Sequence, residues 1–265
     1  MQALRQQQLR KQRQRRFAIG GGLAALAAAI IAVVIAVTTT GGTKTAAKAT
    51  TTTTKPAATT TTTSLPPVSV PLLDAPKNVG CPALNGSSPH YTHFQAKPPM
   101  CISPSKTYTA TMVTNLGTIV IKLDTAASSS AVNNFVFLSG YHFYDGTEFH
   151  RIVTGFVDQG GDPTGTGTGG PGYHFDGGKP ASTKVYTAGA RAMANNGGNP
   201  ATDGSQFFIV VGKGGQELGS PDYTYFGNVT KGLEVVDAIN KDGSDTTAGT
   251  PTKIDKIEKV TISAS

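Results

Sequence analysis

An arginine stands inside a stretch of residues that otherwise favours a β-strand. The segment FHRIVTGFVDQGGD, residues 149–162, places Arg151 directly before two β-branched residues, with Phe156 and Gln159 further along. A guanidinium is always charged and is rarely buried unless it is paired. One interpretation is a surface strand whose arginine points to water. The other is a shallow site where a fixed cation meets a bound group.

A glycine-rich segment follows closely. GTGTGG, residues 165–170, matches the G-x-G-x-x-G pattern of dinucleotide-binding turns. Such a turn lies between a strand and a helix, whereas here GGDPT precedes the segment and PGYHF follows it. We therefore expect a glycine loop and no cofactor.

The chain contains two cysteines, Cys81 and Cys101. In an oxidising compartment an isolated pair is most simply a disulfide. The alternative is a metal site that adds His90 and His93 to the two thiolates, but the spacing matches neither C-x-x-C nor the usual zinc patterns. A disulfide candidate and no metal site follow from this spacing.

The residues after Tyr108 show the patterns of regular secondary structure. Strands are predicted over 107–115, 118–124, 149–157, 205–213, 224–230 and 260–263, which are rich in β-branched and aromatic residues. Helices are predicted over 128–139 and 231–240, where apolar residues recur at helical spacing. With 32 Gly and 16 Pro, loops must occupy much of the domain. The pattern favours a closed or nearly closed antiparallel sheet.

The positive charge of the chain is confined to its N-terminal part. Residues 1–73 contain nine Lys and Arg and no acidic residue, which leaves 14 basic against 16 acidic residues in 74–265. The folded part thus has no basic excess that could follow a phosphate backbone. We expect no nucleic-acid partner.

Residues 17–37 form an uncharged apolar run behind a basic tail, residues 1–16. As a helix this run would rise about 31 Å, enough to cross a bilayer. The basic flank lies only on the N-terminal side, which predicts a cytoplasmic N-terminus and an extracytoplasmic remainder. A cleaved signal peptide is the alternative, although its apolar region would be shorter and would end in a small-residue cleavage site. Both interpretations export the rest of the chain.

The next segment, residues 38–74, is dominated by Thr, Ala, Lys and Pro and includes runs of threonine. It has few large apolar residues to bury, so burial cannot offset the entropy of ordering. We interpret it as a flexible linker that holds the following domain away from the membrane.

Three long motifs carry a resemblance to a known family. FHRIVTGFVDQGGD, MANNGGNPATDGSQFFIVV and YFGNVTKGLEVVDAI resemble, in order, the signature segments of the cyclophilin-type peptidyl-prolyl cis–trans isomerases. The resemblance covers roughly residues 108–263 and implies a closed eight-stranded antiparallel β-barrel capped by two helices. The chain is thus divided into a basic tail (1–16), a transmembrane helix (17–37), a linker (38–74), a Cys-bounded extension (75–106) and an isomerase-like domain (107–265).

The resemblance also implies site residues. Arg151 would be the catalytic donor to the prolyl nitrogen, and Gln159 would hold Arg151 and the substrate backbone. Substrate-binding positions implied in the same way are Phe156, Val157, Ala194, Asn195, Gln206, Phe208, Leu218 and Tyr223. Phe207 and Phe208 are neighbours on a strand, so we expect one to fill the core while the other faces the site.

This chain departs from the family pattern in one segment and at one position of the proposed pocket. The segment GKGGQELGSPDY, residues 212–223, is longer than is usual in the family. Val157 stands where many members have methionine, which predicts a roomier pocket.

The leading hypothesis is therefore a membrane-anchored bacterial isomerase, extracytoplasmic and single-pass, that assists the folding of exported proteins. Its expected partners are proline-containing polypeptides, and its catalytic domain is expected to be monomeric. The alternative is a low-turnover module that binds proline-containing peptides or acts as a chaperone on the same membrane face. A passive envelope component would not need Arg151, Phe156 or Gln159.

Overall fold

The computed structural model describes residues 65–265 as one antiparallel sheet with two α-helices and three short 3-10 helices. The strands are β1 (Tyr108–Thr114), β2 (Gly117–Leu123), β3 (Arg151–Val153), β4 (Val157–Gly160), β5 (Ala190–Met193), β6 (Phe207–Val210), β7 (Tyr225–Lys231) and β8 (Ile257–Ala264). The helices are α3 (Ser129–Gly140), α4 (Leu233–Asn240), η1 (Thr183–Val185), η2 (Pro200–Thr202) and η3 (Gly214–Glu217).

The segments predicted as a basic tail, a transmembrane helix and most of a linker lie outside the described residues. Within residues 65–265 no helix is both long and apolar enough to cross a bilayer.

The strands follow the order β3-β4-β6-β5-β7-β2-β1-β8, and every neighbouring pair is antiparallel. Within the described residues no ladder joins the two edges, β3 and β8. Backbone bonds from the segment before β3 span that gap: Phe149 N donates to Asp255 O at 2.9 Å, and Ile257 N donates to Thr147 O at 2.7 Å. The eight strands form a half-barrel, and full closure of the predicted barrel is not shown, because in the described part of the chain the edges are joined only by the isolated bridge of Glu148 with Lys256 and these neighbouring backbone bonds.

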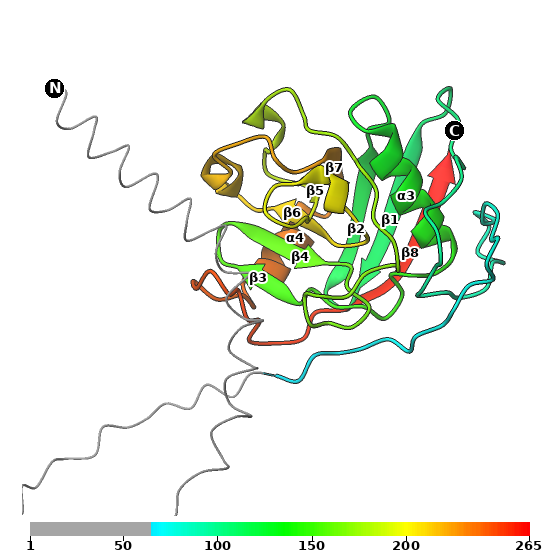
Figure 1. Cartoon of the computed structure of the whole chain (residues 1–265). Coiled ribbons are helices and arrows are strands. Elements are labelled where there is room, and N and C mark those ends of the chain that lie inside the picture. Colours follow the sequence, from blue (N-terminus) through cyan, green and yellow to red (C-terminus); the bar gives the residue numbers. More distant parts are fainter. Residues whose placement is uncertain (1–64) are drawn as a thin grey trace, which may run out of the picture. The chain divides into compact units, whose positions relative to one another are not determined.

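The two helices pack against different strands of this half-barrel. Helix α3 contacts β7 and β8, and α4 contacts β2, β3 and β4 (Figure 1). The Ser128 hydroxyl accepts from Ala131 N at 3.2 Å and so caps α3, as expected for a serine before a helix. Both helices lie where the sequence predicts them, within about two residues.

Two details of the strands differ from the sequence prediction. Residues 149–157 are not one strand, because a turn at Gly155 with φ of 69° separates β3 from β4 and sends the chain back. A left-handed residue cannot continue a strand, so the turn creates a hairpin. Strand β5 was not predicted, because its sequence ARAM lacks the β-branched residues that indicate strands.

The half-barrel separates two apolar clusters. The main core on the inner face includes Phe207 together with Phe135 of α3 and Phe226 of β7. Phe208 belongs instead to a second cluster with Val157 and Leu218. Successive side chains of a strand point to opposite faces, so the expectation that Phe207 and Phe208 diverge is confirmed.

Arg191 lies inside the main core and is fully buried. Its guanidinium carbon is 3.6 Å from the ring centre of Phe207, 3.8 Å from that of Phe135 and 5.1 Å from that of Phe226. Its side-chain nitrogens have no hydrogen-bond partner among the described residues. Burial lowers the pKa of Arg191 to about 9, so the group is still a cation at neutral pH.

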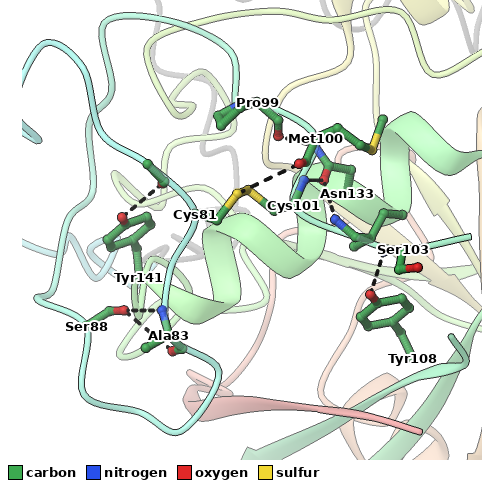
Figure 2. The surroundings of a disulfide bond; sticks show 12 residues. Cys81, Ala83, Ser88, Pro99, Met100, Cys101, Ser103, Tyr108, Asn133 and Tyr141 are labelled. Atoms are coloured by element: carbon green, nitrogen blue, oxygen red, sulfur yellow. Dashed lines mark hydrogen bonds between the residues drawn. A yellow bond between two sulfur atoms is a disulfide. The ribbon is translucent and has the colours of Figure 1, made fainter.

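The Cys-bounded extension packs along α3. The structure joins Cys81 and Cys101 by a disulfide, with 5.4 Å between the Cα atoms (Figure 2). Asn133 of α3 accepts from Cys101 N at 2.6 Å and donates to Pro99 O at 2.9 Å. On the other side of the bridge, the Tyr141 hydroxyl donates to the Gly80 carbonyl at 3.0 Å. The extension is thus fixed to the domain at both cysteines.

We predict that replacing both cysteines by serine lowers the free energy of unfolding of the full chain by about 3 kcal/mol, because the unbridged denatured chain gains loop entropy. Urea denaturation followed by circular dichroism measures the difference. Wild-type chain with its disulfide reduced is the control, and its free energy of unfolding should equal that of the double serine variant. An oxidised wild type no more stable than the serine variant would show that the bridge constrains nothing.

We predict that Arg191→Met raises the free energy of unfolding by about 1–2 kcal/mol. Burying a cation without a hydrogen-bond partner costs several kcal/mol, and the close contacts with Phe207 and Phe135, at about 2 kcal/mol each, offset only part of that cost. Arg191→Lys should be less stable than wild type, because a compact ammonium cannot stack between rings. Thermal and urea unfolding of the three chains measure their relative stabilities. A clear loss of stability in Arg191→Met would contradict the prediction.

Candidate active site

Arg151 begins β3, and its half-buried guanidinium is held from two sides. Nη1 donates to Gln159 Oε1 at 3.3 Å, and Nε and Nη2 donate to the Thr247 carbonyl at 3.3 and 3.0 Å. A guanidinium has five N–H donors, so these three bonds leave two free for a ligand. Gly249 allows this arrangement, because a Cβ there would lie 2.9 Å from Arg151 Cγ. The side chain is therefore fixed in direction and still able to donate.

A line of amides continues from Arg151 across the sheet. Gln159 lies directly opposite Arg151 in the β3–β4 pairing, and its Nε2 donates to Gln206 Oε1 at 3.0 Å. Gln206 Nε2 then donates to the carbonyls of Gly167 and Gly169 at 3.0 and 2.9 Å. The glycine-rich segment is thus a loop that anchors this chain of hydrogen bonds, and no helix follows it.

Arg151 and Tyr223 influence each other electrostatically. Burial lowers the pKa of Arg151, and the nearby Tyr223 partly opposes that shift. Burial raises the pKa of Tyr223, and the Arg151 cation partly lowers it again. A partly desolvated guanidinium hydrogen-bonds more strongly than one in water. The pair therefore places a fixed cation beside an aromatic ring.

A partly exposed apolar surface lies on the outer face of the sheet next to this cation. Its buried members are Val157, Tyr186, Ala190, Ala192, Phe208, Val210, Leu218 and Tyr225. Partly buried residues packed against them are Phe156, Val185, Ala194 and Tyr223. The rings of Phe208 and Tyr223 meet edge to face, with 5.3 Å between their centres. We call this set the outer cluster.

Asn195 follows the outer cluster and is fixed by its side chain. Its Nδ2 donates to Asp203 Oδ1 at 3.2 Å and to the Asp222 carbonyl at 3.1 Å. Among residues 65–265 no hydrogen bond occupies its backbone amide or carbonyl. The backbone groups of Asn195, a residue that is 8% exposed, are therefore not used by the fold, and their role in binding stays a prediction.

Asp203 is buried among polar neighbours. The Thr224 hydroxyl lies 2.6 Å from Asp203 Oδ2 and 2.7 Å from the Gly178 carbonyl, and its one hydrogen can serve only one of them. Burial raises the pKa of Asp203 to about 7, against the hydrogen bonds of Thr224 and Asn195. A protonated Asp203 could donate to Thr224, which would then donate to Gly178.

The structure brings the sequence-predicted site residues together. Arg151, Gln159 and Gln206 form the polar line, while the apolar residues predicted for the pocket all fall in the outer cluster. Asn195 directly follows Ala194, a member of the outer cluster whose N donates to the Gln206 carbonyl at 2.9 Å. Their roles in binding and catalysis remain predictions.

Sequence reasoning missed three groups of the site. Thr247 and Gly249 hold Arg151, but they lie about a hundred residues away in the chain and no local pattern marks them. Tyr186 fixes the backbone of Tyr223: its hydroxyl donates to Tyr223 O at 2.6 Å and accepts from Tyr223 N at 3.1 Å. The alternation of alanines at 190, 192 and 194 could have indicated a strand with a small-residue outer face.

The titratable groups near Arg151 do not form a nucleophile–base pair. Burial lowers the pKa of His150 to about 4, so its ring is neutral at pH 7. Among the described residues, no three His, Cys, Asp or Glu side chains group in a way that could hold a metal ion.

The described site offers a fixed cation with two free donors beside an apolar surface. It can therefore hold an apolar ring and stabilise a lone pair or partial negative charge next to it.

Comparisons with known proteins agree on one family. The family model described as cyclophilin type peptidyl-prolyl cis-trans isomerase/CLD matches residues 109–262. Peptidyl-prolyl cis-trans isomerase A of Mycobacterium tuberculosis is 42% identical over 185 residues, which cover 61% of this chain and 95% of the relative. The peptidyl-prolyl cis-trans isomerase of Helicobacter pylori is 40% identical over 141 residues, covering 52% of this chain and 83% of the relative.

Solved structures give the same answer. A cyclophilin type peptidyl-prolyl cis-trans isomerase of Cryptosporidium parvum has a TM-score of 0.53 and 32% identity, covering 59% of this chain and 98% of that one. The same protein determined in the presence of the dipeptide Ala-Pro has a TM-score of 0.52 and 33% identity, covering 58% of this chain and 98% of that one.

The raised pKa of Asp203 predicts how stability depends on pH. The pKa of Asp203 is near 4 in the unfolded chain and about 7 in the folded chain. At a pH between these two values, the folded state therefore binds a proton that the unfolded state has lost. The contribution of Asp203 to the free energy of unfolding is therefore largest at a pH below its unfolded pKa. It falls as the pH rises, by at most about 1.4 kcal/mol per pH unit. Asp203→Asn should remove this part of the slope, as measured by urea unfolding from pH 4 to 8.

The matched control is Glu258→Gln, which removes an exposed carboxylate from β8 and should leave the slope unchanged. A ¹³C-NMR titration of the Asp203 carboxyl checks the cause directly. An Asp203 that titrates near 4 would contradict the prediction.

Proposed function

Since the chain belongs to the family of cyclophilin-type peptidyl-prolyl cis–trans isomerases and is an enzyme of that class, we propose that Arg151 is its catalytic residue. The observation that carries the proposal is the fixed guanidinium with two free donors beside the outer cluster.

The reaction is a rotation, and its barrier comes from amide resonance. The cis and trans forms of an X–Pro bond are close in energy, but rotation between them meets a barrier of about 18–20 kcal/mol. In the twisted transition state the prolyl nitrogen becomes pyramidal and regains its lone pair. A donor aimed at that nitrogen binds the transition state better than the planar ground state, and only such differential binding accelerates the reaction. No proton needs to be transferred.

The energies required are moderate. Uncatalysed isomerisation takes tens of seconds, so a typical turnover of about 10 per second asks for roughly 4 kcal/mol. A hydrogen bond from a charged donor contributes about 1.5–3 kcal/mol. Partial burial of Arg151 and an apolar seat for the ring supply the remainder, because both strengthen electrostatic interactions by excluding water.

The other site residues act around this donor. Phe156, Val157, Phe208 and Leu218 seat the proline ring on the outer cluster. Gln159 fixes the direction of Arg151 and is itself fixed by Gln206. The free backbone groups of Asn195 bind the residue before proline. The Ala-Pro dipeptide present with the C. parvum relative supports a proline-containing polypeptide as the substrate.

The setting of this activity follows from the N-terminal sequence. The uncharged run 17–37 behind a basic tail supports a single-pass anchor with a cytoplasmic N-terminus. The threonine-rich linker then holds the enzyme on the extracytoplasmic side, where newly exported proteins fold. The Cys81–Cys101 disulfide is consistent with that compartment, because disulfides persist in oxidising environments. Exported proteins are thus the proposed clients.

We predict that Arg151→Ala lowers kcat/KM by about a hundred-fold, since it removes one charge-assisted hydrogen bond made in the transition state. Arg151→Lys should lose less, because it keeps the charge but not the fixed fork. A protease-free assay, which follows cis–trans exchange of a short X–Pro peptide by NMR, measures the rates on the full chain.

The control is Lys259→Ala, which removes an exposed cation from β8 and should leave the rate unchanged. If Arg151→Ala kept full activity, the mechanism would be wrong. A wild-type chain that binds the peptide without accelerating exchange would instead favour the low-turnover binding module.

A further inference from the structure

A second hollow adjoins the outer cluster. A pocket of about 450 Å³ is lined by Thr183, Lys184, Tyr186, Thr187, Ala188, Gly212, Lys213, Gly215, Gln216, Leu218 and Gly219. Tyr186 and Leu218 belong to this pocket and to the outer cluster alike. A polypeptide whose proline lies on the outer cluster therefore passes the mouth of the pocket.

The walls of the pocket come from two separate segments. One is η1 with the residues after it, and the other is the start of the segment 212–223 together with η3. That second segment is the one whose sequence is longer than is usual in the family. The pocket is thus built in part by the segment 212–223.

The lining carries positive charge without a counter-charge. Lys184 on one wall and Lys213 on the other are exposed and form no ion pair with any described residue. No lining residue is acidic. The threonine hydroxyls at 183 and 187 and the Gln216 amide offer further hydrogen-bond donors. Donors of these kinds, with two cations on opposite walls, suit a carboxylate.

The charge of the pocket contrasts with that of the surrounding domain. Residues 74–265 contain 14 basic and 16 acidic residues. The domain as a whole therefore exerts no general attraction on acidic chains, and a preference for them would have to arise locally.

We propose that this pocket is a specificity subsite that binds an Asp or Glu side chain of the client chain, within about four residues of the isomerised proline. The pocket adjoins the outer cluster at Tyr186 and Leu218, and an extended chain rises about 3.3 Å per residue, so a few residues suffice to reach from one to the other. The subsite rests on the proposed function, because it selects among the substrates of the same site. It makes the enzyme prefer acidic sequences around proline.

The test uses the full chain and a set of unstructured alanine-based peptides, each with one X–Pro bond. Glu, Gln or Lys is placed in turn at each of the four positions on either side of that bond. NMR exchange gives kcat/KM for each peptide at low salt and at 0.5 M salt. Glu should exceed Gln by about three- to ten-fold at one or two adjacent positions on one side, in the range of one or two exposed ion pairs. Added salt should abolish the difference.

Two double variants test whether the two lysines of the pocket cause the preference for Glu. Lys184→Gln with Lys213→Gln should reduce the Glu-to-Gln ratio to about one, and Lys184→Glu with Lys213→Glu should make Lys the preferred residue at the same positions. Lys259→Gln is the matched control, because it removes one exposed cation from β8 and should keep the wild-type ratio.

The outcomes separate the two proposals. A wild type that turns over all peptides without preferring Glu overturns the subsite and leaves the isomerase mechanism intact. The subsite is also overturned if the Glu preference persists in the double glutamine variant. Absence of turnover on every peptide overturns the proposed function and the subsite together.

Discussion

The cross-strand register of the β3–β4 hairpin determines where the Arg151 guanidinium lies. Arg151 lies opposite Gln159 in this pairing, and the amide of Gln159 holds one end of the guanidinium while the Thr247 carbonyl holds the other. A slip of one residue would turn both side chains to the opposite face. The turn at Gly155 fixes that register because it connects two very short strands. The position of Arg151 thus depends on a hairpin in which only three residue pairs face each other.

The rest of the sheet has two distinct faces, an outer one and one that covers the main core. Two arginines illustrate the difference: Arg151 lies on the outer side with two donors free, whereas Arg191 points into the main core among three aromatic rings. The outer cluster contains alanines at positions 190 and 192 beside Phe208, and their side chains are small. Tyr186 fixes the loop that carries Tyr223 above it. The polar line adjoins the outer cluster where Gln159 lies opposite Phe208, and the outer cluster adjoins the pocket at Tyr186 and Leu218.

The extension adds a constraint at α3, away from the outer cluster. Asn133 and Tyr141 bind it on either side of the disulfide, and the ring of Phe94 packs against that of Phe137 with 5.0 Å between their centres. The next residue of α3, Asn134, donates to the Gly204 carbonyl at 2.8 Å, two residues before Gln206. The segment that joins the linker to the domain is therefore packed on the same helix that supports the polar line.

The sequence by itself determined the helices, the strands rich in β-branched residues, the divergence of Phe207 from Phe208 and the residue types of the site, because these depend on short-range periodicity and on long motifs. Only the tertiary structure decided that no strand ladder in the described part of the chain joins β3 to β8, that β5 is a strand and that the Thr247 carbonyl accepts from Arg151. It alone showed that Lys184 and Lys213 face one pocket. Such contacts join residues far apart in the chain, and local patterns carry no information about which distant segments meet.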